Sequence, residues 1–263
     1  MSDAQIPRPS AASAGLGVRF VLVRTSHPGN IGAAARAIRT MGFTRLVLVA
    51  PHKYPHADAT AMAAGADDVL DAIEVVPTLD AAIADCTLVL GCTARRRGVQ
   101  LPEFAPRDAA AQADAGARVG EVAIVFGNER TGLENDELMR CNAAVHIPSD
   151  PGFSSLNLAQ AVQVLAYELR NQVIAAAPGT APEMRTDPPA TAEQMEHFHG
   201  HLSQLLVDID FHKGRSPATI ERRLRRLFSH AQLDQREVRI LRGIFDDAQR
   251  MARLARRDAT PKG

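Results

Sequence analysis

The stretches VAIVFGNERTGL (residues 122–133) and HIPSDPGFSSLNLAQAVQVLAYELR (residues 146–170) decide the fold of this chain. They contain two apolar, strand-like runs, each followed by a loop rich in glycine or serine, and the second loop leads into a long helical pattern. Each loop falls where a strand ends, and open α/β sheets place their ligand sites at that edge. The stretch therefore predicts an α/β fold with an active site in these loops.

Short, nearly continuous apolar runs recur through the first two thirds of the chain, as in strands buried within a parallel sheet. They lie at residues 18–23, 45–50, 73–76, 87–91, 122–127 and 144–148. Helical patterns lie between and after them, at residues 30–41, 57–64, 79–84, 135–141 and 155–176. This alternation predicts an α/β layer fold. The last of these helices has so little polar surface that we expect it to be buried, either in the domain or against a partner subunit.

The composition along the chain predicts a division into four segments. Residues 1–17 lack the basic start and apolar core of a signal peptide, so we expect a disordered arm. Residues 18–176 form the α/β domain, and residues 177–190, with four prolines, are expected to be a linker. Three helical patterns, at 191–209, 217–230 and 234–257, then predict a small helical extension over residues 191–263, with Ser216 and Pro217 beginning its second helix.

The composition is that of an ordinary soluble protein, with 46% hydrophobic and 23% charged residues among 263. Apolar runs stay well short of the roughly 20 residues of a membrane span, so we expect a cytoplasmic protein with no membrane partner. Three cysteines without CxxC spacing argue against disulfides and against zinc. The closely spaced His197, His199 and His201 lack a carboxylate in helical register, so we expect no metal.

The formal net charge of zero hides an asymmetry. Residues 211–263 carry 14 lysines and arginines against 6 carboxylates, a net charge of +8, which leaves −8 on residues 1–210. A basic tail on an acidic body indicates an anionic partner such as nucleic acid, although a solvated arginine-rich helix face would look the same. We expect the side chains of Arg222, Arg223, Arg225 and Arg226 to be largely exposed.

The first loop, RTSHPGNIG (residues 24–32), matches neither GxGxxG nor GxxxxGK[ST]. This disfavours an NAD enzyme and a P-loop ATPase. Asn30 is a candidate cap for the following helix. Arg36 rises from a run of small residues on that helix, where it could meet a phosphate or could be an ordinary surface arginine.

Three further loops carry polar groups at strand ends. GCTARRRG (residues 91–98) presents three arginines that could hold a polyanion, GNERTG (127–132) presents Glu129, and SSLN (154–157) presents two hydroxyls and an amide. Solvent exposure, a glycine turn and helix capping are the alternative explanations. We find no Ser-His-Asp order and no paired carboxylates that would support hydrolysis.

Together, HPGNIGAAARAIRTMG, VFGNERTGL and IPSDPGFSSLNLAQAVQVLAYE, in this order after successive strands, resemble the SPOUT class of RNA methyltransferases. Within that class the chain is similar to the TrmJ type, the bacterial tRNA (cytidine/uridine) 2′-O-methyltransferases that act at anticodon-loop position 32. The similarity extends from about residue 18 to residue 250 and includes RRLRRLF and ILRGIF of the tail.

This resemblance implies a mostly parallel sheet with helices on both faces, a C-terminal trefoil knot, bound S-adenosylmethionine and a homodimer. It implies that the cofactor is bound by Cys92, Thr93, Ala94, Gly127, Glu129, Ile147, Ser154, Ser155, Leu156 and Asn157. Catalysis would fall to Arg36, Ser155 and Asn30. RNA would be held by Arg36, Arg95, Arg97, Arg222, Arg223, Arg225 and Arg226.

The function so implied is 2′-O-methylation of a tRNA anticodon-loop ribose. One alternative is methylation of ribosomal RNA or of another tRNA position, and the helical tail favours the first reading because many ribosomal relatives lack it. A second alternative, of another class, is a non-catalytic RNA-binding protein that keeps the fold as a scaffold. Intact Asn30, Arg36 and Glu129 argue against that loss of activity.

Overall fold

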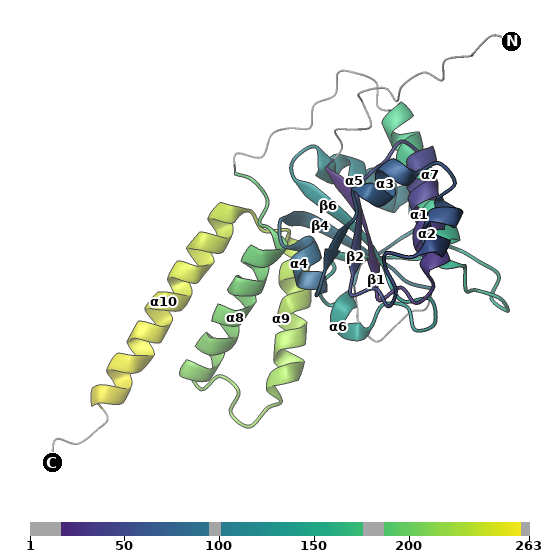
Figure 1. Ribbon diagram of the computed structural model, residues 1–263. Coiled ribbons are helices and arrows are strands. Elements are labelled where there is room, and N and C mark those ends of the chain that lie inside the picture. The colour runs from purple at the N-terminus through teal and green to yellow at the C-terminus, as the bar shows by residue number, and fades with distance from the viewer. Residues whose placement is uncertain (1–16, 95–100, 176–186, 259–263) are drawn as a thin grey trace, which may run out of the picture. The chain divides into compact units, whose positions relative to one another are not determined.

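The computed structural model describes residues 17–94, 101–175 and 187–258. The chain divides into two compact units, with the boundary between residues 184 and 185. The first unit contains a sheet and its covering helices, and the second contains helices α8, α9 and α10 (Figure 1). No described helix is long and apolar enough to cross a membrane.

The first unit is built on a seven-stranded sheet in the order β3-β2-β1-β6-β4-β7-β5, and all pairings among these strands are parallel. The strands are β1 (Val18–Val23), β2 (Leu46–Val49), β3 (Glu74–Val76), β4 (Cys86–Cys92), β5 (Glu103–Phe104), β6 (Glu121–Phe126) and β7 (Ala143–Val145). From β1 the chain first builds outward through β2 and β3, and later strands add on the other side of β1. The crevice at such a reversal is where open α/β sheets bind ligands.

Helices cover both faces of this sheet, as the resemblance implied. The helices are α1 (Pro28–Thr40), α2 (Ala57–Ala63), α3 (Asp67–Asp71), α4 (Leu79–Ile83), α5 (Pro106–Ala117), α6 (Asn135–Leu138) and α7 (Leu158–Ala175). Helices α1, α5 and α7 share one buried cluster with the sheet. On the other face, the Arg19 guanidinium donates to the Ala82 carbonyl of α4, and a Cβ at Gly91 would meet the Leu138 side chain of α6.

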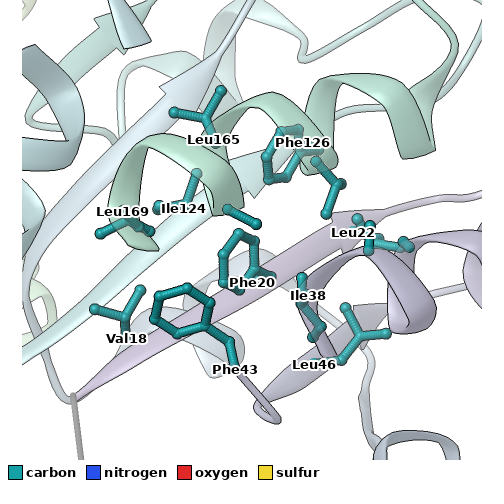
Figure 2. Packing of buried hydrophobic residues seen from close by; sticks show 14 of the residues in the cluster. Val18, Phe20, Leu22, Ile38, Phe43, Leu46, Ile124, Phe126, Leu165 and Leu169 are labelled. Carbon is teal, nitrogen blue, oxygen red and sulfur yellow. The ribbon is translucent and has the colours of Figure 1, made fainter. Parts of the chain in front are cut away.

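The main core lies between the sheet and helices α1, α5 and α7. Figure 2 shows Phe20 of β1 at its centre, with Phe43, Phe126 and Leu165 around it. The rings of Phe20 and Phe126 stack with centroids 6.4 Å apart, and that of Phe43 is tilted at 5.7 Å. Burying side chains of this size stabilises the fold by about 1.5 to 3 kcal/mol each. The apolar runs of β1 and β6 therefore fix the interior beneath the loops that follow them.

The sequence pattern missed three elements: α3, β5 and α5. Helix α5 is rich in alanine, so its apolar face stands out little from its polar face, and β5 is only two residues long. Proline at the first position of α5, Pro106, was the available signal. Two helix starts were also misplaced. Helix α1 begins at Pro28 rather than residue 30, and α7 begins at Leu158 rather than residue 155.

The second unit packs α8 (Ala192–Asp208), α9 (Pro217–Ala231) and α10 (Gln235–Asp258) around Phe198. The Phe198 ring meets the Phe228 ring edge-on at 4.7 Å and lies 5.4 Å from the Phe245 ring. The end of the expected linker belongs to this unit, because Ala190 is buried in its core and its amide donates to the Leu233 carbonyl.

Candidate active site

A cavity of about 450 Å³ opens at the carboxyl ends of β4, β6 and β7. Volumes of this order suit a small organic cofactor. It is lined by Cys92, Thr93, Ala94, Phe126, Gly127, Asn128, Glu129, Arg130, Thr131, Gly132, Ile147, Ser154, Ser155, Leu156, Leu158 and Ala161. Its walls combine apolar side chains with hydroxyls and with two charged side chains, those of Glu129 and Arg130. The cavity can therefore hold a flat apolar ring beside polar groups.

The structure brings most of the expected cofactor residues together here. Nine of the ten line the cavity, and Asn157 is the exception. The sequence did not single out Phe126, Asn128, Arg130, Thr131, Gly132, Leu158 or Ala161. Phe126 ends a strand and Leu158 begins a helix, and the sequence pattern predicted both elements. Whether the side chain of such a residue faces the core or a cavity depends on tertiary packing, which the pattern does not give.

The turn after β6 is rigid because two backbone segments touch within it. A Cβ on Gly127 would lie 2.1 Å from the backbone of both Gly132 and Leu133, so this position requires glycine. Gly132 has a positive φ of 66°, and its amide donates to the Asn128 carbonyl at 2.8 Å. The Asn128 amide group also donates to the Arg24 carbonyl at 2.6 Å. The turn is thereby tied to the loop after β1.

Glu129 makes the second connection between these two loops. Its carboxylate accepts the backbone amides of Ser26 at 2.9 Å and His27 at 3.1 Å and the Asn30 side-chain amide at 2.9 Å. Partial burial by itself raises the pKa of Glu129, but the hydrogen bonds from Asn30, Ser26 and His27 outweigh it, so the pKa is lowered. A carboxylate at the start of α1 also faces the positive end of the helix dipole. Glu129 is therefore an anion that fixes the first turn of α1.

Asn30 does not cap α1, contrary to the sequence expectation. The N-cap is His27, and Asn30 lies in the first turn, where its side chain bridges two loops. It donates to Glu129, and its oxygen accepts the Asn157 side-chain amide at 3.0 Å. Asn157 in turn accepts the Ala159 amide at 2.9 Å and so caps α7. Loops far apart in sequence are thus held in one arrangement.

The serines of SSLN precede α7 instead of lying in its first turn. Ser154 and Ser155 line the cavity, and the Ser149 hydroxyl donates to the Ser154 carbonyl at 3.0 Å. Helix capping was the alternative explanation for the polar residues of SSLN. Among Ser154, Ser155 and Asn157, it is Asn157 whose side chain caps α7. Just before them, Phe153 is 84% exposed, an aromatic surface that the sequence reading overlooked.

Arg36 lies on the exposed side of α1, between the buried Ala35 and Ala37. No carboxylate within the described ranges pairs with its guanidinium, whereas Arg39 on the same helix pairs with Asp68 at 2.7 Å. Within the described ranges, Arg36 is therefore a cation without a carboxylate partner, on a helix whose first turn is held by Glu129. Such a cation can bind a phosphate.

The Cys92 thiol does not serve as a nucleophile despite its place in the cavity wall. Burial raises the pKa of Cys92 to about 12, so the thiol stays protonated and unreactive at neutral pH. The site offers hydroxyls, amides and arginines for its chemistry.

The tail arginines divide into two kinds. Arg222 and Arg223 are exposed on α9, as expected. Arg225 is not: its guanidinium pairs with both carboxylate oxygens of Glu196 on α8, at 2.8 Å for Nη2 to Oε2, and it is only partly exposed. The expectation of broad exposure was wrong for Arg225 because Glu196 lies opposite it across the helix pair. Arg95, Arg96 and Arg97 lie outside the described residues.

Two histidines of α8, His199 and His201, pack against aromatic rings, whereas His197 is exposed. His199 contacts the rings of Phe198 and Phe228, and burial together with the nearby Arg225 charge lowers the pKa of His199 to about 4 despite Glu196. His201 lies 3.1 Å from the Gln249 oxygen. Over residues 17–94, 101–175 and 187–258 no cluster of metal-binding side chains occurs.

Comparison with known proteins follows the same division of the chain. Residues 17–167 match the SpoU rRNA Methylase family, and residues 193–258 match the tRNA methyltransferase TrmJ, C-terminal domain. The tRNA (cytidine/uridine/adenosine-2′-O-)-methyltransferase TrmJ of Pseudomonas aeruginosa is 47% identical over 244 residues, covering 90% of this chain and 95% of that protein. The tRNA (cytidine/uridine-2′-O-)-methyltransferase TrmJ of Salmonella typhimurium is 46% identical over 229 residues, covering 87% and 94%. The crystal structure of TrmJ from Z. mobilis ZM4 is 38% identical with a TM-score of 0.74, covering 87% of this chain and 97% of that one.

Proposed function

Because this chain belongs to the SpoU rRNA methylase family, we propose that it transfers the methyl group of S-adenosylmethionine to a ribose 2′-hydroxyl of tRNA. The observation that carries the proposal is the cavity at the ends of β4, β6 and β7 in a chain whose tail matches a tRNA methyltransferase domain. The relatives at 46 and 47% identity are tRNA 2′-O-methyltransferases, and this chain aligns with nearly their whole length. Both facts favour tRNA over ribosomal RNA, and methylation over simple RNA binding.

The cavity fits S-adenosylmethionine in size and in the chemistry of its lining. Ile147, Leu156 and Leu158 offer apolar surface for an adenine ring, while Thr93 and Ser154 offer hydroxyls for polar substituents. When bound, this cofactor supplies a methyl group already activated by a sulfonium charge. The protein therefore needs to align the ribose and to help its hydroxyl lose a proton.

Arg36 is the residue we assign to that second task. A guanidinium without a carboxylate partner can bind the phosphate beside the reacting ribose and stabilise negative charge on the 2′-oxygen. Electrostatic stabilisation of this kind contributes about 2 to 4 kcal/mol at comparable sites. Ser155, exposed at the cavity wall, is placed to position cofactor or ribose, and Asn30 holds the loops around them.

We also propose the trefoil knot and the homodimer of the SPOUT class. The knot is supported by the match of residues 17–167 to the SpoU rRNA Methylase family, which belongs to this class. A dimer through α7 is supported by the exposed Tyr167 and Ile174, which are 52 and 67% accessible in the single chain. Light scattering on the purified protein tests the dimer, and a monomer at micromolar concentration would exclude it. A cytoplasmic location follows from a tRNA substrate.

Labelled S-adenosylmethionine and tRNA lacking this modification test the function. We expect label in a 2′-O-methylated nucleoside after nuclease digestion, and fragment mapping should place it at anticodon-loop position 32. Deproteinised ribosomal RNA is the competing substrate. A folded protein that binds the cofactor yet labels only ribosomal RNA, or no RNA, would contradict the proposal.

A further inference from the structure

Arg130, in the turn after β6, is a charged cavity residue with no role in the mechanism given above. It lines the cavity and its side chain is exposed. Its backbone amide donates to the Asn128 side-chain oxygen at 2.9 Å, so its position in the turn is fixed. The turn is rigid in addition because Gly127 and Gly132 touch. A guanidinium is therefore presented at the cavity mouth from a backbone that cannot easily move.

The carboxylates nearest in sequence do not neutralise Arg130. Glu129 accepts three donors from the loop after β1 and from Asn30. Glu134 and Glu137 both pair with Arg24. The positive charge of Arg130 is thus left for a ligand.

Among the described arginines of the first unit, Arg130 alone combines a place in the cavity wall with the lack of a carboxylate partner. Of the unit's ten described arginines, six form ion pairs, namely Arg19, Arg24, Arg39, Arg45, Arg118 and Arg140. Arg36, Arg107, Arg130 and Arg170 have no carboxylate partner over residues 17–94 and 101–175. Of these four, Arg130 lines the cavity, and Arg36 lies on α1, whose first turn Glu129 contacts through Asn30. The Glu129 contacts link the two segments that carry these cations.

We propose that Arg130 binds a phosphate of the RNA next to the nucleotide that is methylated, so that Arg36 and Arg130 hold two phosphates of one strand. The inference rests on the proposed function. A planar guanidinium binds phosphate through two parallel hydrogen bonds. Because the Arg130 side chain is exposed, it contacts a large ligand such as RNA more readily than a small cofactor enclosed in the cavity. Arg130 then contributes to the affinity for RNA and to the alignment of the ribose.

The test compares Arg130→Ala and Arg130→Lys with Arg107→Ala, a matched control that removes an equally exposed, unpaired arginine from α5. We expect Arg130→Ala to weaken tRNA binding about tenfold and to lower the slope of log K against log salt by about 1. Cofactor affinity, measured by calorimetry without RNA, stays unchanged. Arg130→Lys restores part of the binding, because the charge returns without the planar donor pair, and Arg107→Ala behaves as wild type.

Each other outcome overturns the inference in a distinguishable way. Equal loss of cofactor affinity in Arg130→Ala would make Arg130 a cofactor ligand instead. Unchanged tRNA binding with wild-type turnover would leave the proposed function intact and refute the role of Arg130. A wild-type protein that neither binds nor methylates tRNA would refute the proposed function, and the inference with it.

Discussion

At the scale of single residues, Arg36 and Glu129 have different roles: Arg36 is available to the substrate, and Glu129 stabilises the protein structure. Arg36 is an exposed cation on α1 with no carboxylate partner among the described residues, while Glu129 is an anion whose oxygens accept hydrogen bonds from Ser26, His27 and Asn30. The first is available to a substrate, and the second organises the loops around it. Substitution should therefore affect catalysis in one case and folding in the other.

Arg36→Ala should lower kcat by a factor of about 30 to 1000, corresponding to the electrostatic stabilisation of about 2 to 4 kcal/mol assigned to this group. Cofactor affinity should stay unchanged, because Arg36 is not among the residues lining the cavity. Single-turnover methylation and calorimetry with the cofactor check the two expectations. Arg39→Ala on the same helix is the control and should keep its rate. A parallel loss of turnover and cofactor binding in Arg36→Ala would show that Arg36 is structural.

Glu129→Gln should reduce the free energy of unfolding by about 1 kcal/mol at neutral pH, because α1 loses a carboxylate at its positive end. The pKa of Glu129 is lowered in the folded protein, so its contribution is present above the unfolded-state pKa. It is lost as the pH falls through the lowered folded-state pKa. Urea unfolding of both proteins across this range checks the sign, with the exposed Glu74→Gln as control. A stability difference that grew on acidification would contradict this account.

At the scale of elements, the α1–α2 contact depends on a glycine. A Cβ on Gly32 would lie 1.9 Å from the Ala59 carbonyl oxygen of α2, which is backbone and cannot rotate away. Because α1 carries Arg36 and is held by Glu129, a change in this crossing also displaces site residues.

Gly32→Ala should destabilise the protein by about 1 to 3 kcal/mol through overpacking. Gly200→Ala, in the middle of α8, is the matched control, since a Cβ there meets nothing within 4 Å. That change should stabilise by about 0.5 to 1 kcal/mol, because alanine favours the helix. Thermal unfolding of the two variants distinguishes them, and a stable Gly32→Ala protein would show that the helices can separate at little cost.

At the scale of the whole molecule, the charge asymmetry divides within the second unit, because residues 185–210 carry a net charge of −4 and residues 211–263 carry +8. Even in this basic part, not every arginine is free to bind RNA. Arg222 and Arg223 are exposed, whereas Arg225 joins α9 to α8 through Glu196. The arginine cluster of α9 thus contains exposed arginines that can bind RNA and an arginine that holds two helices together.

Replacing Arg222 and Arg223 together by glutamine should raise the KM for tRNA and lower the salt slope of binding by about 1 per arginine. The melting temperature should not change. Arg225→Gln should instead lower the melting temperature, because the ion pair between Arg225 of α9 and Glu196 of α8 is lost. Calorimetric melting and salt titrations of tRNA binding separate the effects. If Arg225→Gln changed only the salt slope, Arg225 would be an RNA contact.

The sequence by itself determined the layer fold and the loops that carry the site. Continuous apolar strands such as Val18–Val23, glycines after strands and a proline-rich break are local signals, and nearly all the expected cofactor residues line one cavity. Only the tertiary structure decided which polar groups meet: that Glu129 holds the start of α1, and that Asn30 bridges loops instead of capping. It also decided that Arg225 pairs with Glu196, while Arg130 has no carboxylate partner in the part of the chain that the structure describes. These outcomes depend on the distances between segments that lie apart in the sequence, by about a hundred residues or more for the loops that Asn30 bridges, and the spacing of residues along the chain does not contain those distances.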